Sequence, residues 1–250
     1  MMNDSPILLH VPHASTYIPP EELPRFCSGD LADELLKMTD RYCDELFSGY
    51  ESIVFPVSRL VCDPERFRDD EQEAMSRIGM GAIYTKTSSG APLRHVTSEE
   101  REQMLRRYYD PHHARLAAAV EQKLRLYSRC LIVDGHSFHP APLSYELDQE
   151  PDRSDYCIGT DPFHTPEGLA TLAVDFLRRE GFSVSVNRPY AGSLVPLKYY
   201  RRDRRVCSIM IEINRRLYMD GNGQRSNRFF SIQRTVSALL KKLEGWQCSA

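Results

Sequence analysis

The chain has 250 residues, 41% of them apolar, and its 32 basic and 35 acidic side chains give a formal net charge of −3. Such a near balance offers no electrostatic reason to expect nucleic-acid or anionic-membrane binding, and no apolar run approaches the ~18 residues of a membrane span. The length suits one large hydrophobic core, so we expect a single domain over residues 1–250.

Five short apolar runs, rich in branched side chains and bounded by polar or turn residues, predict buried strands. In chain order they lie at residues 7–9, 53–55, 131–133, 184–186 and 209–213.

Helical patterns occupy the segments between these runs. Residues 30–47 fit one or two short helices, with Thr39 as a cap. Thr97 opens a capping box, and Pro111 should break or kink the helix that follows before it resumes over 114–127.

Two helices are predicted in the second half of the chain. Thr165 is expected to cap a helix with Pro166 at its first position and Gly181 just past its end. A last helix is expected at about 226–243.

The alternation of strands and helices predicts an α/β fold with three layers, in which a mostly parallel or mixed sheet lies between helices. Two long stretches, 68–94 and 140–165, have weak periodicity and are predicted to be loops. Loops of that length in compact domains are usually functional.

Ligands bind outside the carboxyl ends of strands in open α/β sheets, so polar residues that follow each apolar run are the first candidates for a site. Their composition is typical of a polar active site. They are His10, His13, Ser58, Arg59, Asp63, Arg66, Asp134, His136, His139, Asn187, Tyr190, Ser193, Glu212, Asn214 and Arg215.

Glu212 is the one charged residue in the apolar run 209–213. A carboxylate buried without partners costs several kcal/mol, so it must be neutralised, hydrogen-bonded or directed at a cation or a water-filled cleft. The alternative is a structural ion pair with an arginine. We favour a catalytic acid or base, because carboxylates with perturbed pKa values are common in active sites.

Histidines recur as His10-x-x-His13 and His136-x-x-His139 at two separate strand ends. With carboxylates available, this favours a metal site, although a lone histidine is more often a surface or core residue. A catalytic zinc takes about three imidazole or carboxylate ligands and keeps one open position. There is no H-E-x-x-H helix, G-x-S-x-G elbow or G-x-G-x-x-G loop in the chain. The metal ligands must therefore come from distant segments.

Seven cysteines are scattered without a C-x-x-C pair, and the first residues lack the pattern of a secretion signal. We therefore expect reduced thiols, no cysteine zinc site and a cytoplasmic protein.

Taken together, several segments resemble the N-formylglutamate amidohydrolase (N-formylglutamate deformylase) family, over residues 7 to about 220. The ordered set carries the resemblance, and no single motif does. The segments are 10–15 (HVPHAS), 39–41 (TDR), 44–47 (DELF), 58–67 (SRLVCDPERF), 109–113 (YDPHH), 134–137 (DGHS), 187–192 (NRPYAG) and 211–215 (IEINR).

The family looks related to zinc-carboxypeptidase-like and aspartoacylase-like hydrolases, and the resemblance implies that fold, one zinc ion and a water-activating glutamate near the last strand. The carboxypeptidase pattern H-x-x-E is absent, since Thr16 stands where its glutamate would follow His13. Asp40 is our choice for the carboxylate ligand, with Asp44 in reserve and Asp33 or Asp134 as further alternatives. The chain also has Glu65 where the family's D-P-N-R stretch has asparagine.

We therefore expect zinc, or another divalent transition metal, on His13, Asp40 and His136, with Glu212 as the general base and Arg59 stabilising the oxyanion. Guanidinium groups bind carboxylates bidentately, so a small anionic substrate should meet arginines. The predicted substrate-binding residues are Arg66, Asn187, Tyr190, Ser193 and Arg215.

The resemblance implies hydrolysis of N-formylglutamate to formate and glutamate, a step of histidine degradation. Two alternatives remain open. One is an amidohydrolase for another N-acyl amino acid or a short peptide, because fold does not fix the acyl group. The other is a non-catalytic metal- or ligand-binding module on the same scaffold.

Overall fold

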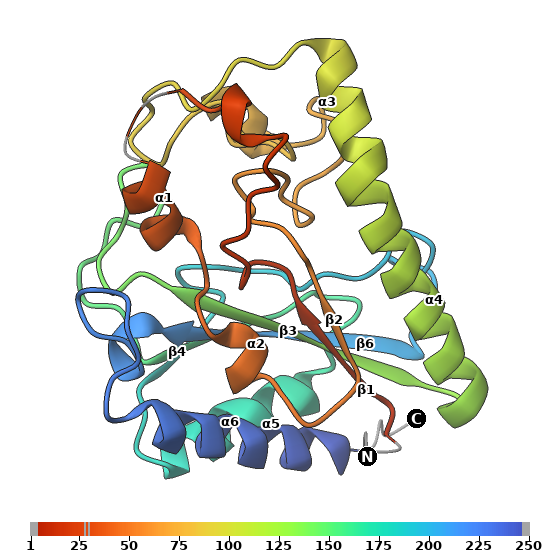
Figure 1. Ribbon diagram of the computed structural model, residues 1–250. Helices are drawn as coiled ribbons and strands as arrows, with labels where there is room; N and C mark the ends of the chain where they lie inside the picture. The colour runs from red at the N-terminus through yellow and green to blue at the C-terminus, as the bar shows by residue number, and fades with distance from the viewer. Residues whose placement is uncertain (1–4, 28, 30, 247–250) are drawn as a thin grey trace.

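A computed structural model describes residues 5–27, 29 and 31–246. Its centre is a six-stranded sheet with the order β2-β1-β3-β6-β4-β5 (Figure 1). The first four strands of that order run parallel, whereas β4 is antiparallel to β6 and parallel to β5. The strands are β1 (Ile7–Val11), β2 (Ser52–Val54), β3 (Cys130–Phe138), β4 (Tyr156–Gly159), β5 (Val184–Val186) and β6 (Val206–Asn214).

Helices cover both faces of this sheet, as the sequence predicts for a three-layer α/β fold. The longest, α4, packs on one face, while α5 and α6 lie together on the other (Figure 1). The α-helices are α1 (Leu31–Met38), α2 (Cys43–Leu46), α3 (Ser98–Met104), α4 (Asp110–Tyr127), α5 (Glu167–Arg179) and α6 (Phe229–Glu244), with 3-10 turns η1 (Leu23–Arg25), η2 (Ala74–Ile78) and η4 (Arg215–Leu217) and a π-helical segment η3 (Leu105–Tyr109).

The strands differ from the predicted runs mainly in length. β3 extends through Asp134 and His136, so both residues lie inside the strand and not beyond its end. β4 lies within the predicted loop 140–165, because Ile158 is the one branched aliphatic side chain among its four residues and they form no apolar run. The stretch 68–94 forms a loop with one short 3-10 turn, as predicted.

The helix predictions need three corrections. The capping box at Thr97 is present, but the α-helix resumes at Asp110 and not at residue 114. A π-helical segment interrupts it before that point, and Pro111 lies in the first turn of α4, where a missing N–H costs little. Thr165 does not cap α5, because its hydroxyl donates to Ser208 O. Thr39 does not cap α2, which begins after Tyr42, and Asp30 lies outside the described residues.

Alternate residues of each strand point to opposite faces, and this alternation positions the polar groups. Leu8 of β1 and Ile132 of β3 pack under α4. His10, Asp134 and His136 continue the same face toward the carboxyl ends of these strands. The register pairs His10 with Asp134 and His136 with Glu212 across neighbouring strands. The polar residues therefore form one row beyond the part of the face that α4 covers.

Within the described residues, no helix combines the length and hydrophobicity needed to traverse a lipid bilayer.

Candidate metal and catalytic site

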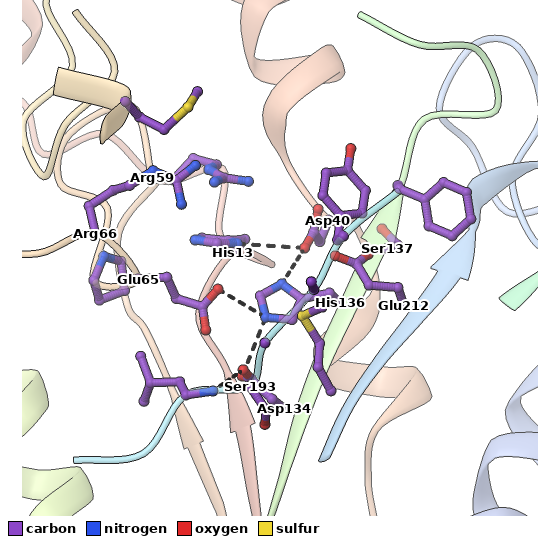
Figure 2. A pocket seen from close by; sticks show the side chains of 18 of the residues that line it. His13, Asp40, Arg59, Glu65, Arg66, Asp134, His136, Ser137, Ser193 and Glu212 are labelled. Atoms are coloured by element: carbon purple, nitrogen blue, oxygen red, sulfur yellow. Dashed lines mark hydrogen bonds and ion pairs between the residues drawn. The ribbon is translucent and has the colours of Figure 1, made fainter. Parts of the chain in front are cut away.

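A cavity of about 560 Å³ opens where this polar row meets the loops after β1 and β2. Segments far apart in the sequence line it, including parts of both predicted loops, with Met75 from one and Tyr145 from the other. His13, Asp40, His136 and Glu212 all lie on its wall, so the structure brings the predicted metal ligands and the predicted base together (Figure 2).

His13 follows β1, and its imidazole is fixed by Asp63. Nε2 donates to Asp63 Oδ1 at 2.8 Å, and the other carboxylate oxygen accepts from Arg59 and from the Tyr84 hydroxyl, each at 2.7 Å. Burial alone would raise the pKa of Asp63, but the charges of Arg59 and His13 outweigh it and hold that pKa well below its usual range. Because Nε2 is occupied, Nδ1 is the ring nitrogen left for a metal, and it is buried without a hydrogen-bond partner among the described residues.

Asp40 lies between the two imidazoles. Its Oδ2 is 3.2 Å from His136 Nδ1 and 3.7 Å from His13 Nδ1, while Oδ1 accepts from Arg215 Nη2 at 2.8 Å. Burial would raise the pKa of Asp40, but the two neighbouring histidines and the charge of Arg215 lower it well below its usual range. Asp40 is therefore a carboxylate anion, with one oxygen facing both histidines.

His136 presents its other nitrogen, Nε2, to two further carboxylates. Glu65 Oε2 is 3.1 Å away and Asp134 Oδ1 is 3.3 Å away. Burial opposes charge on this ring, yet Glu65 and Asp134 outweigh it and hold the pKa of His136 well above its usual value. In the metal-free protein this imidazole therefore carries a proton that a metal would displace.

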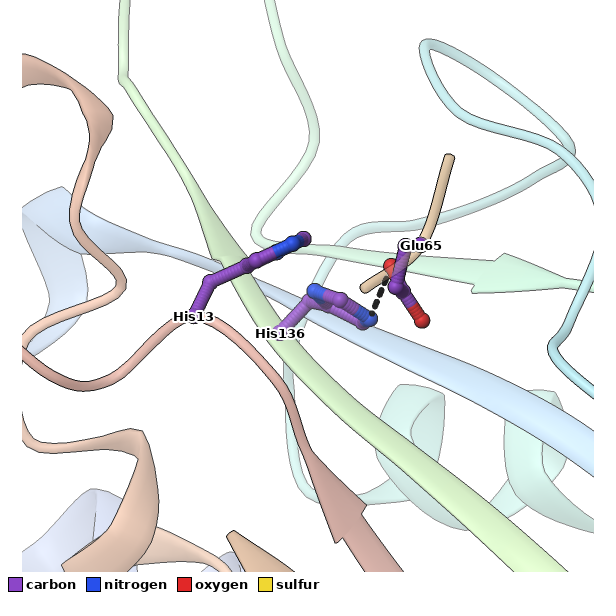
Figure 3. Close-up of side chains that lie close together, drawn as sticks. All are labelled: His13, Glu65 and His136. Atoms are coloured by element: carbon purple, nitrogen blue, oxygen red, sulfur yellow. Dashed lines mark ion pairs between the residues drawn. The ribbon is translucent and has the colours of Figure 1, made fainter. Parts of the chain in front are cut away.

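Two separations in this donor set suit a zinc ion. A tetrahedral zinc with bonds of about 2.0–2.1 Å separates its ligand atoms by about 3.3 Å, close to the separations between Asp40 Oδ2 and the two Nδ1 atoms. Each imidazole also has a carboxylate at its remaining nitrogen, as metal-bound histidines usually do. A different set, formed by His13, Glu65 and His136, brings one ligand atom from each residue within 4.8 Å of the others (Figure 3).

Glu212 lies beside His136 with its side chain 6% exposed. Its Oε2 is buried and makes no hydrogen bond to any described residue. Burial, opposed by the charge of His136, raises the pKa of this carboxyl to about 8. No arginine pairs with Glu212 in the described part of the chain, which argues against the structural ion pair.

Two arginines line the cavity on the far side of the imidazole pair from Glu212 (Figure 2). Arg59 is held by Asp63. Arg66 is half-buried, and its Nε lies 3.9 Å from Asp63 Oδ2 without a hydrogen bond to the described residues. Tyr190 and Ser193 also line the cavity. The Tyr190 hydroxyl donates to Glu146 at 2.7 Å, while Ser193 Oγ has no described partner.

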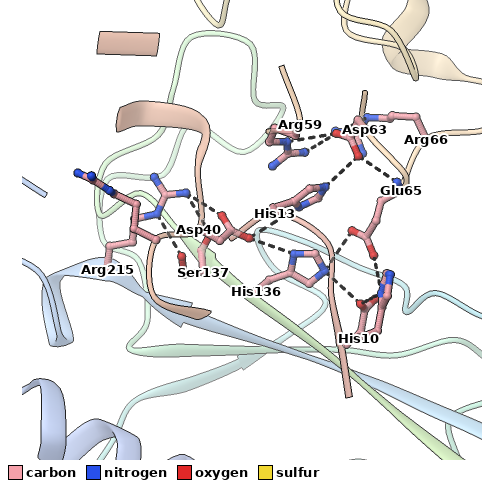
Figure 4. Close-up of polar contacts among 12 residues, drawn as sticks. His10, His13, Asp40, Arg59, Asp63, Glu65, Arg66, His136, Ser137 and Arg215 are labelled. Carbon is pink, nitrogen blue, oxygen red and sulfur yellow. Dashed lines mark hydrogen bonds and ion pairs between the residues drawn. The ribbon is translucent and has the colours of Figure 1, made fainter. Parts of the chain in front are cut away.

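Of the predicted substrate ligands, one lies outside the cavity and another has its side chain engaged by protein groups. Asn187 does not line the cavity, because its side-chain amide pairs with the backbone and hydroxyl of Thr160. Arg215 reaches the cavity, but its guanidinium is engaged by Asp40, Ser137 and the Lys37 carbonyl (Figure 4). Arg215 therefore positions Asp40.

The alternative carboxylate ligands that the sequence offered differ in whether they line the cavity. Asp44 is exposed and Asp33 pairs with Lys37, and neither lines the cavity, whereas Asp134 does. The sequence assigned no role to Asp63, Glu65 or His10. The D-P-E-R stretch was a usable signal, because it places two carboxylates and an arginine directly after a strand.

Comparisons with known proteins agree with the family resemblance that the sequence shows. A model of the N-formylglutamate amidohydrolase family matches residues 5–219. An N-formylglutamate deformylase of Pseudomonas aeruginosa PAO1 is 23% identical, and the alignment covers 96% of this chain and 93% of the deformylase.

Solved structures share the fold. The crystal structure of an N-formylglutamate amidohydrolase from Ralstonia eutropha JMP134 superposes with a TM-score of 0.85 at 26% identity, covering 96% of this chain and 93% of that one. The gene product Atu2144 of Agrobacterium tumefaciens has a TM-score of 0.68 at 19% identity, with 96% and 92% coverage, and shows the fold alone.

Proposed function

The chain belongs to the N-formylglutamate amidohydrolase family, a family of amide hydrolases, and from this premise we propose that it hydrolyses N-formyl-L-glutamate to formate and L-glutamate with one zinc ion. The observation that carries the proposal is a buried set of two imidazoles and a carboxylate beside an unpaired glutamate in a cavity with arginines. The products would place the reaction in histidine degradation.

We assign the zinc to His13 Nδ1, His136 Nδ1 and Asp40 Oδ2. Asp63 occupies Nε2 of His13, so this ring must bind through the nitrogen that faces Asp40. Glu65 lies at the opposite nitrogen of His136 and would support the ring from outside. When bound, the metal would polarise the formyl carbonyl and acidify the attacking water.

Glu212 is the proposed general base. Its side chain lines the cavity beside His136, and its Oε2 has no hydrogen-bond partner among the described residues. There it could take a proton from water and pass it to the departing amine nitrogen. In the metal-free protein the pKa of about 8 keeps this carboxyl mostly protonated at neutral pH. A nearby cation favours the ionised form and lowers the pKa into the range that a base requires.

The arginines are the proposed binding groups for the negative charges of the substrate and of the reaction intermediate. Arg59, fixed by Asp63, would stabilise the tetrahedral oxyanion, and Arg66 would pair with a substrate carboxylate. Ser193 Oγ, which lacks a described partner, would donate to the same anion. A buried guanidinium without its carboxylate is costly, so analogues that lack the second carboxylate should be rejected.

A second candidate substrate class has its own support. Phe67, Leu147 and Leu197 line the cavity, yet their side chains are exposed. An N-acyl amino acid with a longer, apolar acyl group could cover them. This alternative keeps the same metal and base.

The test is a comparison of kcat/KM for N-formylglutamate, N-formylglutamine, N-formylleucine and N-hexanoylglutamate with the zinc-loaded enzyme. We expect N-formylglutamate to be preferred by about 100-fold or more over the two formyl substrates with one carboxylate. Equal values for the three formyl substrates would contradict a dianion site, and preference for the hexanoyl compound would select the second class. Bound zinc without turnover of any of them would indicate a binding module.

A further inference from the structure

A second cluster of metal-ligating side chains lies next to the proposed zinc site. His10 Nδ1 is 2.7 Å from Asp134 Oδ1 and 3.7 Å from Glu65 Oε1, and these ligand atoms all lie within 4.8 Å of one another. His10 and Asp134 are paired across β1 and β3, while Glu65 comes from the loop after β2. Figure 4 shows Glu65 beside both His10 and His136.

Among the side chains that the structure describes, the negative charge of this cluster is balanced only by histidines, whose protons a metal ion can displace. Within the described residues, neither Glu65 nor Asp134 forms an ion pair with lysine or arginine, and their only ionic partners are His10 and His136. Two carboxylates in a buried site need compensation by positive charge or hydrogen bonds.

Two polar atoms in this space make no hydrogen bond to the described residues. Glu65 Oε1 is one, and it faces His10. His136 Nε2 is the other; this side chain is only 4% exposed, and the atom is directed at Glu65 and Asp134. Buried polar atoms without partners are uncommon and call for a missing ligand.

The surroundings of His10 suit a metal-bound imidazole. Its Nε2 is 2.9 Å from His112 Nε2. In the metal-free protein His10 Nδ1 donates a hydrogen bond to Asp134 Oδ1, and a bound cation would displace this proton. The contact with His112 would hold the ring in place, as metal ligands require.

A cation can reach the cluster from the cavity, because Glu65 and Asp134 both line it. The ligand atoms are one imidazole nitrogen and two carboxylate oxygens. Such a set suits zinc and manganese better than soft, thiolate-preferring ions.

We propose that His10 Nδ1, Glu65 Oε1 and Asp134 Oδ1 form a second divalent-cation site, for Zn²⁺ or Mn²⁺, separate from the site on His13, Asp40 and His136. The cation neutralises Glu65 on the wall of a cavity that otherwise receives anions. The chain therefore binds two metal ions, and Glu65 is the residue that creates the second site.

The test is the metal stoichiometry of the full chain. Metal-free protein is titrated with Zn²⁺ in a calorimeter, and bound zinc is counted by mass spectrometry after dialysis, for wild type, Glu65→Gln and His10→Gln. Glu34→Gln is the matched control, because Glu34 is a buried carboxylate that does not line the cavity. We expect two equivalents for wild type and Glu34→Gln, and one for each of the other two variants. The same count with Mn²⁺ checks the choice of ion.

One equivalent in wild type, retained in Glu65→Gln, overturns the second site and leaves the proposed zinc site standing. One equivalent that Glu65→Gln loses also overturns it, and moves the single metal to the set that contains Glu65. Two equivalents in both variants overturn it as well. If His10→Gln does not fold, Glu65→Gln decides alone, because glutamine keeps the shape of the side chain.

Discussion

Alternate residues of β1, β3 and β6 build two very different surfaces. Toward α5 and α6 they present mostly apolar side chains, such as Leu9, Val133 and Ile211, which join one large core. Toward α4 the same strands begin apolar, with Leu8 and Ile132, and become more polar toward their carboxyl ends. The polar residues of this second face include His10, Asp134, His136 and Glu212.

This difference shows how one sheet holds a reactive site without losing stability. The α5/α6 face removes apolar area from water along the full strand length, which is the dominant favourable term in folding. On the α4 face, polar residues stand at the carboxyl ends of the strands, so less apolar area is buried there. Gly135 shows how closely the polar site and the apolar core approach each other, because a Cβ there would lie 2.6 Å from the Phe47 ring on the core side.

Removal of the proposed metal ligands should have the largest effect on the polar face. His136→Ala and Asp40→Ala should each lose bound zinc and the activity with it, because each removes one of three proposed ligands. Asp44→Ala is the matched control, since Asp44 is exposed and lies outside the cavity. Zinc counting and a formate-release assay on the same preparations measure both effects. Full zinc content in Asp40→Ala would transfer the carboxylate role to Glu65.

Substitutions of two neighbouring residues of β6 should distinguish the two faces by a smaller but more specific effect. Glu212→Gln keeps the shape of the side chain but cannot accept a proton, so kcat should fall by about 100-fold or more while zinc is retained. Ile211→Ala, one residue away on the core face, should instead cost about 2–5 kcal/mol of stability with kcat of the folded enzyme nearly unchanged.

Single-turnover rates and thermal melts of the two variants make this comparison. A folded, zinc-loaded Glu212→Gln enzyme with near-wild-type kcat would refute the assignment of the base. A loss of stability in Glu212→Gln without a loss of rate would make Glu212 a structural residue.

The sequence predicts the apolar face better than the polar one, and the reason is physical. Apolar runs such as 209–213 identify buried strands because burial of both faces requires them, and Glu212 stands out against that background. The strand β4 has one branched aliphatic residue, Ile158, so it gives no signal, and its antiparallel pairing depends on contacts distant in sequence.

Polar partners are harder to predict, because spacing does not say which donors a guanidinium will meet. Arg215 was expected to meet substrate and instead holds Asp40. Asn187 was expected in the cavity, but its backbone adopts a positive φ of 54° and its amide pairs with Thr160. Glu65 and Asp63 act through contacts between loops, which no local pattern encodes.

The smallest expected effect concerns the stability that Glu212 costs the metal-free fold. Its pKa is about 8 in the folded chain, mainly through burial, against about 4.5 for an exposed glutamate. Between these two values the unfolded chain has released the proton and the folded chain still binds it. Stability therefore falls as pH rises from about 4.5 to about 8, and levels off above that.

Glutamine does not titrate, so metal-free Glu212→Gln should not show this loss. Melting temperatures in the presence of a chelator at pH 5.5 and pH 8.5 measure the difference. We expect the variant to gain a few degrees over wild type at pH 8.5 relative to pH 5.5. Zinc should reduce that gain, because a cation beside the carboxylate stabilises its ionised form. Equal pH dependence of the two metal-free proteins would mean that Glu212 ionises normally, and the polar face would then cost the fold less than its burial implies.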